Sequence, residues 1–239
     1  MRLKMIFQLR KPELDREYRR AFLSLLKNSF QRASSEVYEK FYGNGTPMKP
    51  FTFGVFLPHP EFKENTIHLK STEITLNFST YLTDLGIHFY NSLIRSKRMF
   101  FPYPLANSNE MTLTRVSLQK EKRIKSSEAV FKTLSPFLVR LHHKEDNVDE
   151  YLTKMNGLFV PQIEENIRVM VDVLLGRKEQ VEYMPVILSD GIPIKHFGLI
   201  LDGTTGIFKL TGHPEVLDFV YQVGIGSRRS EGFGMLESV

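Results

Sequence analysis

The order in which strand-like and helix-like segments follow one another limits the folds open to this chain. Leu3 to Leu9 alternates apolar and polar side chains, as a half-buried strand does. Residues 14–33 instead place their apolar side chains on one face of a helix. The following segments predict two strands, a helix and a strand at residues 51–57, 68–78, 81–94 and 111–118. The first half is therefore predicted as strand, helix, strand, strand, helix, strand.

The same order recurs after residue 125. Pro161 and Pro214 each lie in the first turn of a predicted helix, and Gly176 and Gly224 follow the helix ends. Asp202-Gly203 predicts a turn within a hairpin-like pair of strands. The predicted elements are a strand at 131–141, a helix at 161–175, strands within 181–188 and 197–210, a helix at 214–223 and a strand at 233–239.

This doubled order predicts an α+β protein. Strand, helix, strand, strand, helix, strand is the split βαβ arrangement of ferredoxin-like folds, which include the RRM-like domains. We expect two tandem ferredoxin-like domains, 1–125 and 126–239, with a glycine-rich loop at 224–234 in the second. The two halves have no visible sequence repeat, so the duplication rests on element order alone.

The glycine-rich loop lies between the last predicted helix and the last predicted strand. It runs Gly224-Ile-Gly-Ser-Arg-Arg-Ser-Glu-Gly-Phe-Gly234, so two Gly-apolar-Gly clips bracket two arginines. Such glycines permit positive φ angles and let another backbone or a ligand come close. A P-loop would need Lys and Ser or Thr after its second glycine, and a dinucleotide fingerprint would need glycine where Arg229 stands. The loop matches neither, and its arginines favour an anionic ligand.

Composition sets weaker limits. The 32 basic and 27 acidic residues give a formal net charge of +5, which favours a polyanionic partner. The chain has no cysteine, which excludes disulfides and thiolate metal sites. No apolar run is long enough for a signal-peptide core or a membrane span. We therefore expect a cytoplasmic protein that does not associate with membranes.

Several features together resemble a known family. Thr133-Leu-Ser-Pro136 at the start of the second half, the glycine-rich loop, the length and the doubled fold are similar to the repeat-processing endoribonucleases of CRISPR systems. This is the sixth CRISPR-associated protein family, within the RAMP superfamily. The resemblance implies an RNase that needs no metal and no cofactor and cuts precursor CRISPR RNA within each repeat. In that family a 2′-hydroxyl attacks the adjacent phosphate, leaving a 2′,3′-cyclic phosphate and a 5′-hydroxyl.

The family's catalytic pattern carries over only in part. Its members typically have a tyrosine or lysine on the first helix, matched here by Lys27, and a lysine just before the second strand, matched by Lys49. The usual histidine after the first helix has no counterpart in residues 38–44. The candidate catalytic residues are therefore Lys27, Tyr42, Lys49 and Lys40, with Tyr38 beside them.

Three explanations of the missing histidine stay open. The enzyme cuts without histidine, with cations that position and neutralise the phosphate. Alternatively, His59 or His68 swings into the site, or the chain binds repeat RNA without cutting it. A structural subunit of a CRISPR ribonucleoprotein is a further alternative, because sister RAMP proteins share the doubled fold.

RNA binding would depend on distributed positive charge. Arg16 and Arg20 lie with Lys27 along one edge of the first predicted helix, although such an edge is also an ordinary solvated face. A basic run at Arg95, Lys97 and Arg98 is an additional candidate. The expected partners are CRISPR repeat RNA (precursor crRNA), other CRISPR-associated effector subunits and a second copy of the chain. The candidate RNA contacts are Arg16, Arg20, Lys120, Lys122, Arg123, Gly224, Gly226, Arg228, Arg229, Gly232 and Gly234.

Overall fold

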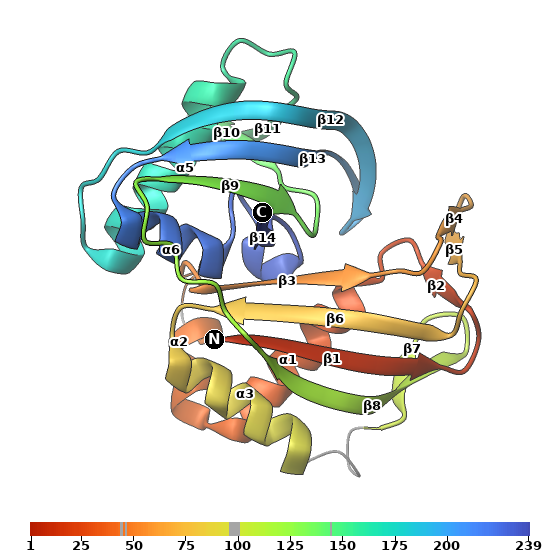
Figure 1. Ribbon diagram of the computed structural model, residues 1–239. Helices are drawn as coiled ribbons and strands as arrows, with labels where there is room; N and C mark the ends of the chain where they lie inside the picture. The colour runs from red at the N-terminus through yellow and green to blue at the C-terminus, as the bar shows by residue number, and fades with distance from the viewer. Residues whose placement is uncertain (44, 46, 96–100, 144) are drawn as a thin grey trace.

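The first half of the chain folds into a five-stranded antiparallel sheet with its helices on one face (Figure 1). The computed structural model describes residues 1–43, 45, 47–95, 101–143 and 145–239. Lys97 and Arg98 of the predicted basic run lie outside them. The sheet order is β3-β6-β1-β8-β7, and β2, β5 and β4 form a small separate sheet. The elements are β1 (Arg2–Leu9), β2 (Glu13–Asp15), α1 (Arg19–Ala33), α2 (Ser35–Tyr42), β3 (Phe51–Phe56), β4 (Glu61–Phe62), β5 (Thr66–His68), β6 (Glu73–Thr80), α3 (Thr83–Arg95), β7 (Tyr103–Leu105) and β8 (Asn109–Gln119).

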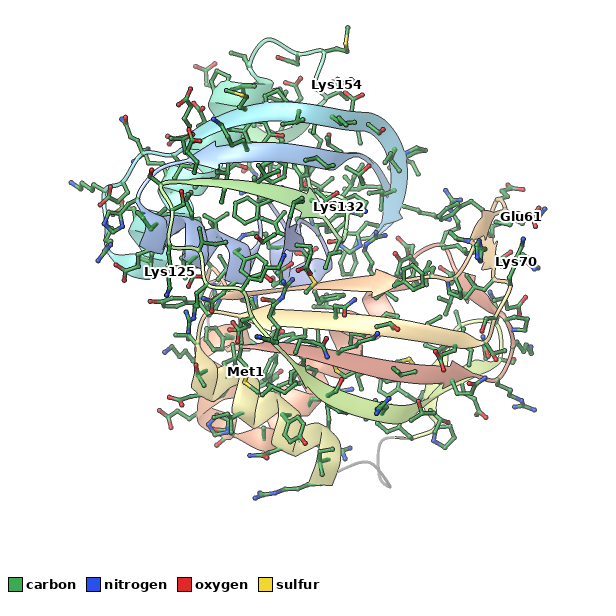
Figure 2. All side chains as sticks on the ribbon, viewed as in Figure 1. Met1, Glu61, Lys70, Lys125, Lys132 and Lys154 are labelled. Carbon is green, nitrogen blue, oxygen red and sulfur yellow. The ribbon has the colours of Figure 1, made fainter. Side chains whose placement is uncertain are left out.

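The second half forms a four-stranded sheet of order β12-β13-β9-β14 and an inserted hairpin of β10 and β11. Its elements are β9 (Glu128–Thr133), β10 (Val139–His143), β11 (Val148–Leu152), α5 (Phe159–Leu175), β12 (Glu182–His196), β13 (Leu199–Thr211), α6 (Pro214–Val223), the 3₁₀ turn η1 (Arg229–Glu231) and β14 (Leu236–Ser238). The predicted domain boundary near residue 125 falls in the strand-free segment between β8 and β9, where Lys125 marks the connection in Figure 2.

The two sheets have the same connectivity. The four strands of the repeated order are β1, β3, β6 and β8 in the first half and β9, β12, β13 and β14 in the second. In each half the first of these four lies between the third and the fourth, and the second lies beyond the third. This arrangement of strand, helix, strand, strand, helix, strand is the ferredoxin-like fold. The predicted α+β fold with two tandem ferredoxin-like domains is therefore confirmed, and the shared strand order supplies the internal repeat that the sequence does not display.

The helices form where their apolar spacing predicts them. α1 buries Phe22, Leu25, Leu26 and Phe30 completely against the sheet, which matches a helical face. α6 has proline in its first turn and ends at Gly224, whose φ of 84° suits glycine. Because these helices are anchored by packing, the loops that follow them have fixed starting points.

Two predicted elements differ from the structure. The predicted strand at 131–141 is two strands, β9 and β10, in different sheets. The chain turns between them because Leu134 donates to the Met235 carbonyl and Phe137 to that of Thr204. The predicted turn at Asp202-Gly203 lies inside β13, and the hairpin instead turns at Phe197-Gly198. Gly203 packs closely there, since a Cβ at this position would require the terminal methyl of Ile194 to shift.

The two halves are joined by buried polar contacts. Arg2 on β1 donates to the Tyr221 hydroxyl and to the Leu236 carbonyl. Thr52 on β3 donates through its hydroxyl to the Phe233 carbonyl at 2.9 Å. Breaking such a buried contact leaves an unsatisfied polar group, so these bonds favour one relative arrangement of the halves. The end of the glycine-rich loop is thereby fixed against β3.

Candidate functional site

A cluster of two lysines and two tyrosines forms where α1, α2 and the start of β3 meet. Ser34 adopts an extended conformation between the helices, and its hydroxyl accepts a hydrogen bond from Val37 N at 3.3 Å. This cap ends α1 and lets α2 start in a new direction. Tyr38 and Tyr42, four residues apart on α2, stack with ring centroids 5.6 Å apart. We call Lys27, Tyr38, Tyr42 and Lys49 the lysine–tyrosine cluster.

The two lysines converge on the same ring. Lys27 Nζ lies 5.7 Å and Lys49 Nζ 4.8 Å from the centroid of the Tyr42 ring, and Lys27 Nζ lies 5.8 Å from that of Tyr38. The ring faces attract the ammonium groups, but the two ammonium groups repel each other. An anion between them would relieve the repulsion, so this arrangement suits a phosphate.

Burial changes the acidity of two members of the cluster. It lowers the pKa of Lys49, an effect that the Glu231 charge opposes and the Lys27 charge reinforces. Burial also raises the pKa of Tyr42, with further contributions from Tyr38 and Glu231. The Tyr42 hydroxyl is buried and has no hydrogen-bond partner among the described residues. Tyr42 therefore stays protonated, and Lys49 is a stronger acid than an exposed lysine.

The second half of the chain adds a carboxylate and a histidine. The turn η1 packs on α1 and β3 and carries Glu231, whose Oε2 accepts from His196 Nε2 at 2.7 Å and from Arg228 at 3.1 Å. Burial alone would raise the pKa of Glu231, but these two partners lower it. Since the carboxylate is ionised, Nε2 of His196 carries the proton.

His196 and Glu231 are the site residues that the sequence reasoning missed. His196 is 1% exposed and ends β12, so its ring supports Glu231 from inside the protein and does not reach the surface. No local pattern pointed to this pair, because its members lie 35 positions apart in the sequence and meet only where η1 packs beside the end of β12.

The remaining candidate catalytic residue lies apart from this group. Lys40 is exposed on α2, and its ammonium lies 5.6 Å from the ring of its neighbour Phe41. His59 and His68 lie past the far end of β3 from Lys49. A strand of that length spans about 17 Å, so neither histidine is near the cluster. The geometry thus disfavours a histidine swinging in from this side.

The loop glycines serve the protein's own backbone. Ile225 N donates to the Gly234 carbonyl at 2.9 Å, and a Cβ on Gly224 would come within 2.5 Å of that same carbonyl oxygen. A Cβ on Gly226 would meet the Leu138 carbonyl, and one on Gly232 the Phe53 ring. Their positive φ angles, expected from the sequence, therefore allow close approach of chain segments, and only Gly226 of the four is not buried.

The two loop arginines have different surroundings. Arg228 adopts a left-handed conformation with φ of 53°, and its Nε donates to the Tyr151 hydroxyl at 2.7 Å. It is partly exposed and stays a proposed RNA contact. Arg229 is only 7% exposed and donates to the Val223 carbonyl at 3.0 Å, and burial lowers its pKa to about 10. Its position differs from the sequence expectation and assigns it to holding the loop together.

The other predicted RNA contacts fall in two places. Arg16 and Arg20 lie near the start of α1, where the Arg16 guanidinium covers the Phe62 ring and that of Arg20 covers the Phe197 ring. Lys120, Lys122 and Arg123 lie in the connection between the halves. There Lys122 donates to the Ser238 carbonyl and Arg123 pairs with Asp218 at 2.8 Å, so both hold the connection against the second half.

Metal ligands and membrane spans can be judged for the described ranges. Within them, no three His, Cys, Asp or Glu side chains are grouped so that they could hold a metal ion. No helix in the same part of the chain is both long and apolar enough to cross a membrane.

Comparison with known families decides the classification. The model of the family described as CRISPR associated protein Cas6, C-terminal, matches residues 119–238, half of the chain. The chain belongs to the Cas6 family. The match includes the glycine-rich loop and η1, so the carboxylate that faces the lysine–tyrosine cluster comes from the part of the chain that defines membership. No curated protein sequence matches the chain.

Solved structures with the Cas6 fold extend the likeness to the first half. A Cas6-related protein from Pyrococcus furiosus is 18% identical, covers 100% of this chain and 98% of its own, and has a TM-score of 0.86. A RAMP protein described as binding different RNA substrates is 18% identical, with coverage of 100% and 99% and a TM-score of 0.85. A Cas6 product complex is 18% identical, with coverage of 100% and 99% and a TM-score of 0.69. At these identities the likeness establishes the fold.

Proposed function

We propose that this Cas6-family chain is an endoribonuclease that binds precursor CRISPR RNA and cuts it within the repeat without a metal ion. The observation that carries the proposal is the convergence of Lys27 and Lys49 on the Tyr42 ring, at 5.7 and 4.8 Å, in a chain of this family. Two cations beside a buried, protonated hydroxyl form a site for one phosphate group.

In the proposed reaction, the 2′-oxygen of one nucleotide attacks the adjacent phosphorus and the bond from phosphorus to the 5′-oxygen breaks. The 2′-hydroxyl proton passes to solvent, and the leaving 5′-oxygen takes up a proton, giving a 2′,3′-cyclic phosphate and a 5′-hydroxyl. Lys27 and Lys49 stabilise the charge on the non-bridging oxygens. Lys49 also donates the proton, because its lowered pKa makes it a better general acid than an exposed lysine.

Histidine has no direct part in this scheme. Much of the acceleration comes from holding the 2′-hydroxyl in line with the phosphorus, an effect worth roughly 7 to 11 kcal/mol in favourable intramolecular cases. His196 acts only through Glu231, whose carboxylate moderates the lowering of the Lys49 pKa. We expect slow cleavage, since no group accepts the 2′-hydroxyl proton directly.

A second candidate function is RNA binding without cleavage. It is favoured by the lack of a histidine in the lysine–tyrosine cluster, and by the fold shared with a RAMP protein described as binding different RNA substrates. In this case the same cluster would hold a phosphate of the repeat and leave its bonds intact.

Incubating the purified protein with a repeat RNA in EDTA separates the candidates. We expect cleavage at a single position, with a 2′,3′-cyclic phosphate on the upstream product, detected by end analysis of the fragments. Tight binding in a gel-shift assay without cleavage would support the second candidate instead. If the protein neither binds nor cuts the RNA, both candidate functions are contradicted.

A further inference from the structure

A cavity at the seam between the two halves lies outside the lysine–tyrosine cluster. Its volume is about 290 Å³. One side is built by the start of α1 and the small sheet of β2, β5 and β4, which projects at the edge of the molecule where Glu61 and Lys70 are labelled in Figure 2. The other side is built by the end of β12 and by Pro136. The cavity therefore exists only when the two halves are packed together.

Its lining combines apolar walls with positive charge. The walls come from isoleucine and proline side chains, among them Ile67, Ile192 and Ile194, and from the aromatic residues Tyr18 and Phe62. Arg16 and Lys195 lie among the lining residues, and the described residues around the cavity include no aspartate or glutamate. An apolar cavity with cations suits a ligand that is flat and apolar at one end and anionic at the other.

The aromatic and cationic groups are arranged for stacking. The Arg16 guanidinium lies 5.0 Å from the centroid of the Phe62 ring, which stays 59% exposed. Nearby, the Arg20 guanidinium lies 5.1 Å from the Phe197 ring, which is 50% exposed. Exposed aromatic rings beside arginines are the usual platform for unpaired bases, since every base has a π-face.

Glu17 is an acidic residue near the cavity, but its charge does not oppose the binding of an anion there. Glu17 accepts from Gly198 N at 2.7 Å and pairs with Arg20 at 2.8 Å. It thereby fixes the β12–β13 turn on the start of α1 and keeps the Phe197 ring in place. Its charge is compensated locally, so the seam stays favourable for a phosphate.

We propose that the cavity holds one unpaired nucleotide of the bound RNA, with its base against Phe62 and its phosphate at Arg16. This inference rests on the RNA-binding function proposed above. The size fits, because 290 Å³ is at the lower limit of small-ligand pockets and suits a single nucleoside. From Arg19 to Lys27 the rise along α1 is about 12 Å, so an RNA strand a few nucleotides long joins this cavity to the lysine–tyrosine cluster.

Abasic scanning of the repeat RNA tests this assignment. Each nucleotide in turn is replaced by one that lacks its base, and the affinity is measured for the unaltered protein and for Phe62→Ala. In the unaltered protein we expect one position in the unpaired part of the RNA, upstream or downstream of the cut, where losing the base weakens binding about 10-fold. In Phe62→Ala the same loss of base changes affinity by less than about 2-fold at that position.

Phe56→Ala is the matched control, because Phe56 is 63% exposed and does not line the cavity. That variant keeps the full penalty at the abasic position. If the unmodified RNA is bound and cut but no position couples to Phe62, the cavity assignment is wrong and the proposed function stands. If the unmodified RNA is neither bound nor cut, the proposed function fails, and the cavity assignment fails with it.

Discussion

Replacing Lys49 with alanine is expected to slow cleavage of a repeat RNA about 100-fold or more. Affinity should change by less than about 10-fold, because the RNA makes many other phosphate contacts. The physical reason is that Lys49 stabilises charge that develops on the phosphate during the reaction and donates a proton to the leaving oxygen. Single-turnover cleavage rates and gel-shift titrations measure the two effects separately.

Lys178→Ala is the matched control for this variant. Lys178 is also a lysine, but it is exposed after α5 in the second half of the chain. Lys178→Ala lowers the net charge by the same amount as Lys49→Ala, and we expect it to leave the cleavage rate unchanged. Normal cleavage by Lys49→Ala would remove Lys49 from the proposed reaction. If the cleavage rate falls equally in Lys49→Ala and Lys178→Ala, the effect comes from the lower net charge and not from a role of Lys49 at the phosphate.

Replacing Gly234 with alanine is expected to destabilise the protein by about 3 kcal/mol or more. A Cβ at this position would overlap the Ile225 carbonyl, and the φ of 66° disfavours any residue other than glycine. The variant also disturbs the pair in which Ile225 N donates to the Gly234 carbonyl. Urea unfolding, followed by circular dichroism, gives the free energy of unfolding.

Gly157→Ala is the control for the glycine prediction. Gly157 lies in a turn, and a Cβ there would meet nothing within 4 Å. Its free energy of unfolding should change by less than about 0.5 kcal/mol. A Gly234→Ala protein as stable as the unaltered one would show that the loop relaxes easily, and the view of its glycines as sites of close backbone packing would be wrong.

Element order could be predicted from the sequence because it depends on local signals. α6 begins at Pro214 and ends at Gly224, and the apolar spacing of α1 defines its buried face. Strand ends and partners could not be predicted in this way. Apolar residues continue from Phe131 past Ser135 and Pro136 to Leu141, which predicts one strand, yet the backbone bonds of Leu134 and Phe137 go to Met235 and Thr204 and separate β9 from β10.

Of the candidate site, only the residues from the first half of the chain could be predicted from the sequence. Lys27 and Lys49 match two positions that the family resemblance implies, and Tyr42 lies between them in the same short stretch of sequence. Glu231 and His196 come from the other half of the chain and reach the site only through the packing of η1 on β3. Long-range packing of this kind leaves no trace in local spacing. For the same reason, the burial of Arg229 could not be inferred from the sequence, where it lies between the polar residues Arg228 and Ser230.

Cleavage of a repeat RNA with a single 2′-deoxy nucleotide, placed directly 5′ to the cut, tests the proposed reaction most directly. The deoxy RNA and the all-ribose RNA are incubated side by side with the protein in EDTA, and binding and product ends are measured for both. The proposed reaction predicts that both RNAs bind, that the all-ribose RNA is cut to a 2′,3′-cyclic phosphate, and that the deoxy RNA stays intact. Cleavage of the deoxy RNA, or an all-ribose RNA that is bound but never cut, would contradict it.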